Sequence, residues 1–161
     1  MPEIIDIPAR DGGTFKAYVA MPKVTPAPVI IVIQEIFGVN QELRDKCEAL
    51  AKDGFIAVCP DLFWRLEPGI ELTDQTEEEW AKAFDCFQRF DVDKGIDDLR
   101  ATKHTFRGHA VSTGKVGCVG YCLGGKLAYL MACRSTIDCS VGYYGVDIDK
   151  MLEEAGNIDQ P

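Results

Sequence analysis

Gly120-Tyr121-Cys122-Leu123-Gly124 is the stretch of sequence that decides the fold. It follows directly on the apolar run Val116 to Val119 and directly precedes the helix-forming run Lys126 to Met131. This order predicts a strand, a sharp turn and a helix. Small residues on both sides of the turn let the chain reverse so tightly that the central side chain projects out of the fold.

The turn resembles the nucleophile elbow G-x-S-x-G, with sulfur where serine is usual. A cysteine at the start of a helix sits in the positive end of the helix dipole, which favours thiolate over thiol. Backbone N–H groups at the same place can face a developing oxyanion. Cys122 is therefore the candidate nucleophile.

Three other interpretations of these residues stay open. Gly120 to Lys126 also spells G-x-x-x-x-G-K, but Leu127 stands where a P-loop has the Ser or Thr that binds magnesium. A G-x-G-x-x-G dinucleotide fingerprint fits worse, because Gly117 and Gly120 are separated by two residues instead of one. The turn could also hold an inert cysteine, since free cysteine is among the most buried residue types.

Length and charge bound the class of protein. A chain of 161 residues suits a single domain with a proper core. The net charge of −9 argues against nucleic acid or an anionic membrane as partner, so we expect a small-molecule partner. No uncharged apolar run approaches a membrane span, and Met1 to Arg10 lacks the layout of a signal peptide. We expect a cytoplasmic protein, most simply a monomer.

Seven cysteines in such a compartment should be free thiols, because disulfides rarely persist there. They form no C-x-x-C pair, and His104 and His109 lie on one segment without a cysteine cluster nearby. We therefore expect no metal site and no cofactor. The six cysteines other than Cys122 are interpreted as small core or surface residues.

The remaining pattern alternates strands and helices. Strands are predicted at 4–8, 14–20, 29–33, 55–59, 115–119 and 140–144, and helices at 42–52, 76–90, 91–106, 123–133 and 147–154. The first two strands flank a turn signal and predict a hairpin, and residues 62–73 predict a loop that lines a pocket. The whole indicates one α/β domain over residues 1–161, with a mostly parallel sheet covered by helices on both faces.

An acid accompanies the cysteine in this prediction. Glu35 comes just after the strand that ends at Ile33, and the carboxyl ends of parallel strands face the same crevice as the turn that holds Cys122. The carboxylate could accept a hydrogen bond from the thiol or set its protonation state. It could equally cap a helix or pair with Arg44.

Four motifs in order closely resemble the dienelactone hydrolase (carboxymethylenebutenolidase) family of the α/β-hydrolase superfamily. The likeness runs from the first hairpin to the last residue. The motifs are Gln34-Glu35-Ile36-Phe37-Gly38-Val39-Asn40, Cys59-Pro60-Asp61-Leu62, Val119-Gly120-Tyr121-Cys122-Leu123-Gly124-Gly125 and Val141-Gly142-Tyr143-Tyr144-Gly145.

The resemblance implies an α/β-hydrolase fold and a hydrolase that cleaves a small lactone or ester. By it, Cys122 attacks the lactone carbonyl and forms a thioester, and the backbone amides of Leu123 and Ile36 form the oxyanion hole. Glu35 would hold the resting thiol protonated and take its proton as substrate enters. We expect the substrate pocket to be lined by Phe37, Trp80, Phe84, Tyr143 and Tyr144.

The sequence departs from the family at two places. The family's triad is completed by an Asp and a His after the strand equivalent to 140–144, and this sequence stops at Pro161, before either. We therefore expect a domain that lacks its C-terminal strands. Neither His104 nor His109 can replace the family's histidine, because both precede the elbow. Trp80 stands where the family has an arginine for the substrate carboxylate, which favours an apolar or differently charged substrate over a dicarboxylate lactone, although Arg89 or a residue after Pro161 could supply a cation. The alternative function is a non-catalytic fragment, pseudoenzyme or redox thiol protein on the same scaffold.

Overall fold

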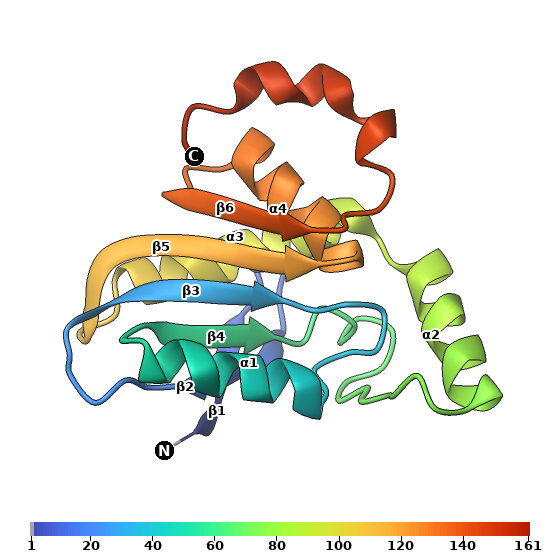
Figure 1. Ribbon diagram of the computed structural model, residues 1–161, viewed down its shortest axis with the longest axis horizontal. Helices are drawn as coiled ribbons and strands as arrows, with labels where there is room; N and C mark the ends of the chain where they lie inside the picture. Colours follow the sequence, from blue (N-terminus) through green and yellow to red (C-terminus); the bar gives the residue numbers. More distant parts are fainter. Residues whose placement is uncertain (1) are drawn as a thin grey trace.

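The computed structural model describes residues 2–161 and builds them around one six-stranded sheet (Figure 1). The chain begins with the predicted antiparallel hairpin, β1 (Glu3–Pro8) and β2 (Thr14–Ala20). The other strands are β3 (Ala27–Ile33), β4 (Ile56–Pro60), β5 (Ser112–Tyr121) and β6 (Cys139–Tyr143).

The strand order is β1-β2-β4-β3-β5-β6. β2 pairs antiparallel with β4, whereas the β3–β4, β3–β5 and β5–β6 pairs are parallel. The central strands are runs of buried apolar residues, the composition expected where both faces of a parallel sheet are covered. The mostly parallel sheet predicted from the sequence is confirmed.

Helices cover both faces of this sheet. α1 (Gln41–Lys52) lies on one face, and α3 (Val92–Arg107) and α4 (Leu123–Arg134) lie on the other (Figure 1). Successive side chains of β3 show the division, because Ile31 and Ile33 belong to the large core under α3 and α4, and Val32 to the smaller core under α1. α2 (Glu77–Arg89) covers neither face and stands beyond the carboxyl ends of the strands.

The segment after β4 is fixed to the core by a buried carboxylate. Asp98 of α3 is fully buried and accepts hydrogen bonds from the indole N–H of Trp64 at 2.9 Å and from the guanidinium of Arg65 at 2.8 and 3.1 Å. Arg65 also pairs with Asp11 in the first turn of the chain. A buried charge needs such partners, and these hold the start of the loop that leads to α2.

Two predictions about elements are corrected by the structure. Residues 147–154 do not form one α-helix but two 3₁₀ helices, η1 (Ile148–Lys150) and η2 (Leu152–Asn157), neither of which buries a residue. Short segments without an apolar stripe commonly take this tighter form. On α2, the predicted apolar face is buried only in part, because Trp80 is 39% and Phe84 50% exposed. Among residues 2–161, no helix has the length and apolarity to cross a bilayer.

Candidate active site

The turn between β5 and α4 has the predicted elbow geometry. Cys122 lies there with φ 56° and ψ −112°, a conformation that few side chains other than glycine adopt. Its N–H donates to the Tyr143 carbonyl at 3.0 Å, and its own carbonyl accepts from Lys126 and Val146 at 3.2 and 3.3 Å. Three backbone hydrogen bonds therefore fix the main chain of Cys122.

Two glycines allow this turn to pack. A Cβ added at Gly120 would overlap the carbonyl of Gly124 in the first turn of α4, and one added at Gly124 would overlap the carbonyl of Ile33 and lie 2.6 Å from that of Gln34. The first turn of α4 thus rests directly on the end of β3. This contact brings Cys122 next to the residues that follow β3.

Glu35 is placed by a buried amide. Gln34 is fully buried, its Nε2 donates to the Glu35 carbonyl at 3.2 Å, and its Oε1 accepts from the Leu62 N–H at 2.9 Å. The turn after β3 is thereby tied to the segment after β4, and Glu35 itself is only half-buried. Sequence patterns gave no sign of this role for Gln34, because a polar residue after a strand is ordinarily solvated.

Both alternative roles for Glu35 are wrong. The side chain of Asn40, not of Glu35, caps α1 by accepting from the Leu43 N–H at 3.2 Å. Arg44 binds Glu71, Gln41 and the Val39 carbonyl instead of Glu35. The carboxylate of Glu35 is left facing the end of the sheet.

Burial and the charge of Glu35 keep the Cys122 thiol protonated. Burial raises the pKa of the Cys122 thiol, the negative charge of Glu35 raises it further, and the backbone N–H of Leu123 acts in the opposite direction. Burial also raises the pKa of Glu35, to which Glu42 and Asp74 add and against which Lys46 acts. The thiolate expected from the helix end is therefore wrong, because desolvation and the neighbouring acid outweigh the dipole. Glu35 thus acts on the Cys122 thiol through its charge.

Solvent access separates the cysteines. Cys122 and Cys139 are partly exposed, and the other five are buried: Cys47, Cys59, Cys86, Cys118 and Cys133. Cys139 pairs with Gly117 at the amino end of β6, away from the carboxyl ends of the strands. Cys122 is thus the partly exposed cysteine at the edge of the sheet where Glu35 lies.

A cavity of about 450 Å³ opens beside Glu35. Its lining residues come from the turn after β3, the start of α1, the loop before α2 and the residue after β6: Glu35, Phe37, Asn40, Gln41, Glu42, Thr73, Asp74, Gln75 and Tyr144. Two predicted pocket residues, Phe37 and Tyr144, are among them. The expectation that the 62–73 loop lines a pocket is met at Thr73.

The other predicted pocket residues lie in two places. Trp80 packs edge-on against Phe37 with ring centroids 5.1 Å apart, and Phe84 stacks on Trp80 at 5.5 Å, so both extend the wall that Phe37 begins. Tyr143 does not join them. It stacks on Tyr121 at 5.2 Å and lines a separate groove of about 390 Å³ between α1 and the sheet. Tyr144 lies just after β6, with a φ of 39°, and its ring centroid is 6.5 Å from that of Tyr143.

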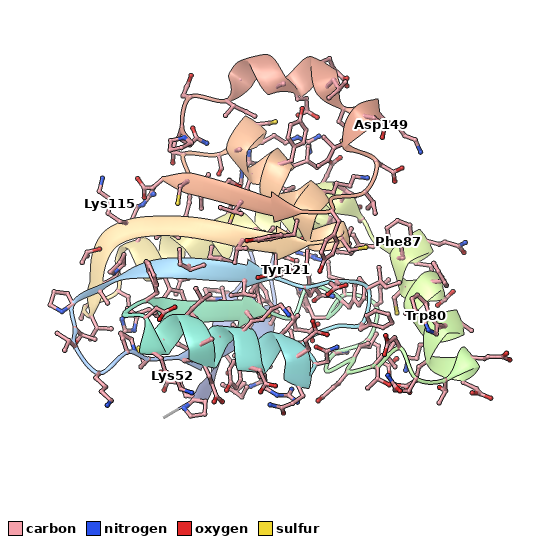
Figure 2. The ribbon with its side chains drawn as sticks, in the orientation of Figure 1. Lys52, Trp80, Phe87, Lys115, Tyr121 and Asp149 are labelled. Atoms are coloured by element: carbon pink, nitrogen blue, oxygen red, sulfur yellow. The ribbon has the colours of Figure 1, made fainter. Side chains whose placement is uncertain are left out.

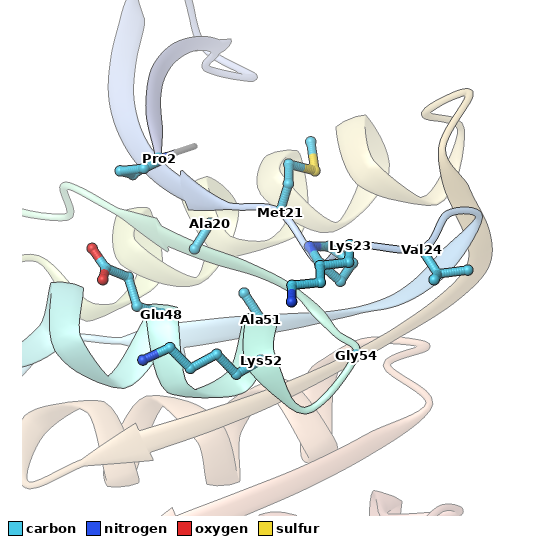
Figure 3. A pocket seen from close by; sticks show the side chains of 10 residues that line it. Pro2, Ala20, Met21, Lys23, Val24, Glu48, Ala51, Lys52 and Gly54 are labelled. Carbon is cyan, nitrogen blue, oxygen red and sulfur yellow. The ribbon is translucent and has the colours of Figure 1, made fainter.

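Other hollows lie away from Cys122. The pocket drawn in Figure 3, also of about 450 Å³, is lined by Lys23, Lys52 and Gly54 at the amino end of β4, with no nucleophile. His104 lines a further cavity with Arg100 and Thr136, and His109 stacks on Phe106. No histidine of residues 2–161 is therefore near the thiol. Within the same residues, no three His, Cys, Asp or Glu side chains are grouped to hold a metal ion.

A mostly parallel sheet with a cysteine of positive φ on a sharp strand-to-helix turn defines an α/β-hydrolase domain. Comparison with known proteins agrees. The model of the dienelactone hydrolase family matches residues 15–161. A putative carboxymethylenebutenolidase of Azospirillum brasilense is 48% identical over 98% of this chain and 68% of its own length. The carboxymethylenebutenolidase of Pseudomonas putida is 45% identical over 99% of this chain and 67% of its own length.

Among solved structures, a putative dienelactone hydrolase from Klebsiella pneumoniae superposes with a TM-score of 0.78 at 28% identity, covering 90% of this chain and 60% of that one. The chain belongs to the dienelactone hydrolase family, a family of hydrolases. It spans about two thirds of the length of these curated relatives.

Proposed function

We propose that this chain carries the nucleophile of an enzyme that opens a small lactone, or cleaves a small ester, through a thioester on Cys122. The observation that carries the proposal is the position of Cys122 at the elbow, with positive φ and with Glu35 as its charged neighbour. The names of the relatives from Azospirillum brasilense and Pseudomonas putida support a lactone substrate.

In this proposal the resting site is a neutral thiol beside a carboxylate. As the substrate enters, Glu35 accepts the thiol proton and the sulfur of Cys122 bonds to the carbonyl carbon. The backbone N–H groups of Leu123 and Ile36 stabilise the oxyanion, as preorganised donors do in a site of low dielectric constant. The ring C–O bond then breaks, the leaving oxygen or its enolate takes up a proton, and water finally cleaves the thioester. A neutral resting thiol resists oxidation and alkylation.

The setting of the enzyme is part of the same proposal. Seven free cysteines suit a reducing compartment, and we place the protein in the cytoplasm as a monomer that meets its substrate by diffusion. Because His104 and His109 are remote from Cys122, the base that activates water comes, in this proposal, from outside residues 2–161. The domain would then be incomplete at its C-terminal side.

The remoteness of both histidines also favours a second candidate, a non-catalytic thiol protein on the same scaffold. The two differ in how the thiol reacts with an activated ester. A hydrolytic nucleophile is acylated selectively, because the oxyanion donors lower the barrier at one cysteine only. A merely structural thiol has no such selectivity.

The test is incubation of the 161-residue chain with p-nitrophenyl acetate, followed by intact mass measurement and peptide mapping. We expect one acetyl group on Cys122, and a thioester that persists, because neither His104 nor His109 lies near it to activate water. Cys122→Ala should abolish the modification, and Cys139→Ala, which removes the other partly exposed thiol, should leave it intact. Acetylation at Cys139 instead of Cys122 would exclude the proposed nucleophile.

A further inference from the structure

The cavity beside Glu35 carries negative charge and no cation of its own. Three of its nine lining residues are the carboxylates Glu35, Glu42 and Asp74, and none is Lys or Arg. Glu42 and Asp74 both raise the pKa of Glu35, so both charges act on the lining residue that neighbours Cys122. A bound carboxylate would meet repulsion from two sides.

Lys46, the cation whose charge acts on Glu35, does not reverse this charge. The ammonium of Lys46 is 2.7 Å from the carboxylate of Glu42 and 5.1 Å from the centroid of the Tyr121 ring. Three carboxylates and one ammonium leave two net negative charges when all four are ionised. Lys46 is thus already paired where a substrate carboxylate would need it.

The arginines near the site are engaged elsewhere. Arg44 binds Glu71 and lines a different cavity, which it shares with Tyr18. Arg89 pairs with Asp85 one turn away on α2, and its side chain is 59% exposed. The cation that the sequence left open at Arg89 is therefore not supplied to this cavity.

Apolar surface continues the cavity along α2. Trp80 lies on the side of α2 turned toward the strand ends (Figure 2), packed against both Phe37 and Phe84. Its indole N–H donates to the Asp74 carbonyl at 2.9 Å, which uses its polar atom and fixes the ring against the cavity wall. Exposed aromatic rings fixed in this way form a surface for an apolar group.

From these contacts we infer that the site selects uncharged lactones or esters whose apolar or aromatic group packs on Phe37, Trp80 and Phe84, and that it rejects substrates bearing a carboxylate. The inference rests on the proposed function and narrows its substrate class. Like charges placed face to face lower association, whereas a neutral ligand of the same shape escapes that cost. The discrimination is electrostatic and so weakens as salt screens exposed charges.

The test compares two esters of equal length, p-nitrophenyl pentanoate and the p-nitrophenyl monoester of glutaric acid. The rate at which each acylates Cys122 is divided by its rate with N-acetylcysteine, which removes intrinsic reactivity. At low salt we expect the neutral ester to react faster by roughly tenfold, and the ratio to shrink as salt is added. The salt series needs no variant, so it holds even where a substitution unfolds the chain.

A matched pair of variants locates the effect. Asp74 and Asp45 are both exposed carboxylates that accept a hydrogen bond from a glutamine amide, at 2.6 and 2.7 Å, but only Asp74 lines the cavity. Asp74→Asn should lower the neutral-to-anionic ratio about threefold, and Asp45→Asn should leave it unchanged. Replacing Trp80 by Ala should slow p-nitrophenyl 3-phenylpropanoate more than the acetate, and Trp80→Phe should restore most of the loss.

The outcomes separate the two proposals. Equal normalised rates for both esters on Cys122, or a faster anionic ester, would overturn the substrate class and leave the nucleophile standing. An equal change in both Asp variants would overturn the role of Asp74 and with it the electrostatic selection at this cavity. Failure of every ester to acylate Cys122 in the folded chain would overturn the proposed function itself.

Discussion

At the scale of single residues, the backbone of Cys122 exposes its sulfur, while the surroundings of the sulfur raise the pKa of the thiol. The strained backbone of Cys122 presents the sulfur, while burial and Glu35 hold its proton in place. The same burial raises the pKa of Glu35 above its ordinary 4.5 and so makes it a better base than an exposed carboxylate. The raised pKa of Glu35 therefore suits the base that the proposed function requires.

Glu35→Gln keeps the shape of the side chain but removes the base. We expect acylation of Cys122 to fall by roughly 10²-fold or more at pH 7. In the parent chain the acylation rate should rise with pH as Glu35 loses its proton, above its ordinary pKa of 4.5, and the variant should lack that rise. Stopped-flow release of p-nitrophenol measures both. A rate equal to that of the parent would return Glu35 to a structural role.

The same substitution should stabilise the fold. A carboxyl group whose pKa is raised by folding contributes stability that is fully present below its unfolded pKa and is lost as pH rises through its folded pKa. At pH 7 the charged Glu35 is therefore unfavourable, and Gln relieves it. Thermal melts should place Glu35→Gln above the parent, with the exposed Glu153→Gln as the matched control. A lower melting temperature for the variant would contradict the burial argument.

At the scale of elements, the site depends on how closely α4 approaches β3. The hairpin, the central strands and the elbow could be predicted because glycine spacing and β-branched runs report local backbone needs. The tie from Gln34 to Leu62 and the exposed position of Trp80 could not, because both depend on segments distant in sequence. The helix dipole alone favoured a thiolate at Cys122, because burial is a property of the assembled elements, whereas the family resemblance implied a protonated thiol.

Gly124→Ala tests that approach. The new Cβ would overlap the carbonyl of Ile33, so α4 must move away from β3 and carry Cys122 with it. We expect a loss of unfolding free energy of about 3 kcal/mol, as for overpacked cores, and slower acylation of Cys122. Urea denaturation and p-nitrophenyl acetate measure the two effects.

The control for this change is Gly156→Ala. A Cβ at Gly156 would meet no atom within 4 Å, so the unfolding free energy should move by no more than about 0.5 kcal/mol. Parental stability in Gly124→Ala would mean that the helix and the strand can separate without cost.

At the scale of the whole molecule, the candidate site residues lie at the carboxyl edge of the sheet. The carboxyl ends of β3 and β5 bring Glu35 and Cys122 together, and α2 stands over that edge instead of covering a face (Figure 1). The last strand, β6, is less protected. Its Val141 and Tyr143 are 47% and 50% exposed, although the Ser140 N–H is covered by the Pro161 carbonyl at 2.9 Å.

An apolar edge strand is prone to pair with another chain. We expect the 161-residue chain to associate at high concentration, and Val141→Lys to reduce this, because a charged edge resists sheet extension. Light scattering over a concentration series provides the measurement. Val24→Lys, at a residue 76% exposed outside the sheet edge, controls for added charge. Identical scattering by both variants would assign the association to another surface.

The sulfur of Cys122 makes no capping hydrogen bond to α4, and the turn that presents it is held by main-chain contacts and by glycines. Folding therefore does not depend on which atom the side chain carries. We expect Cys122→Ser and Cys122→Ala to leave the backbone of the turn unaltered. A larger residue at Gly120 or Gly124 would overlap neighbouring backbone. We therefore expect Cys122→Ala to fold like the parent chain and, under the proposed function, to bind substrate without reacting with it.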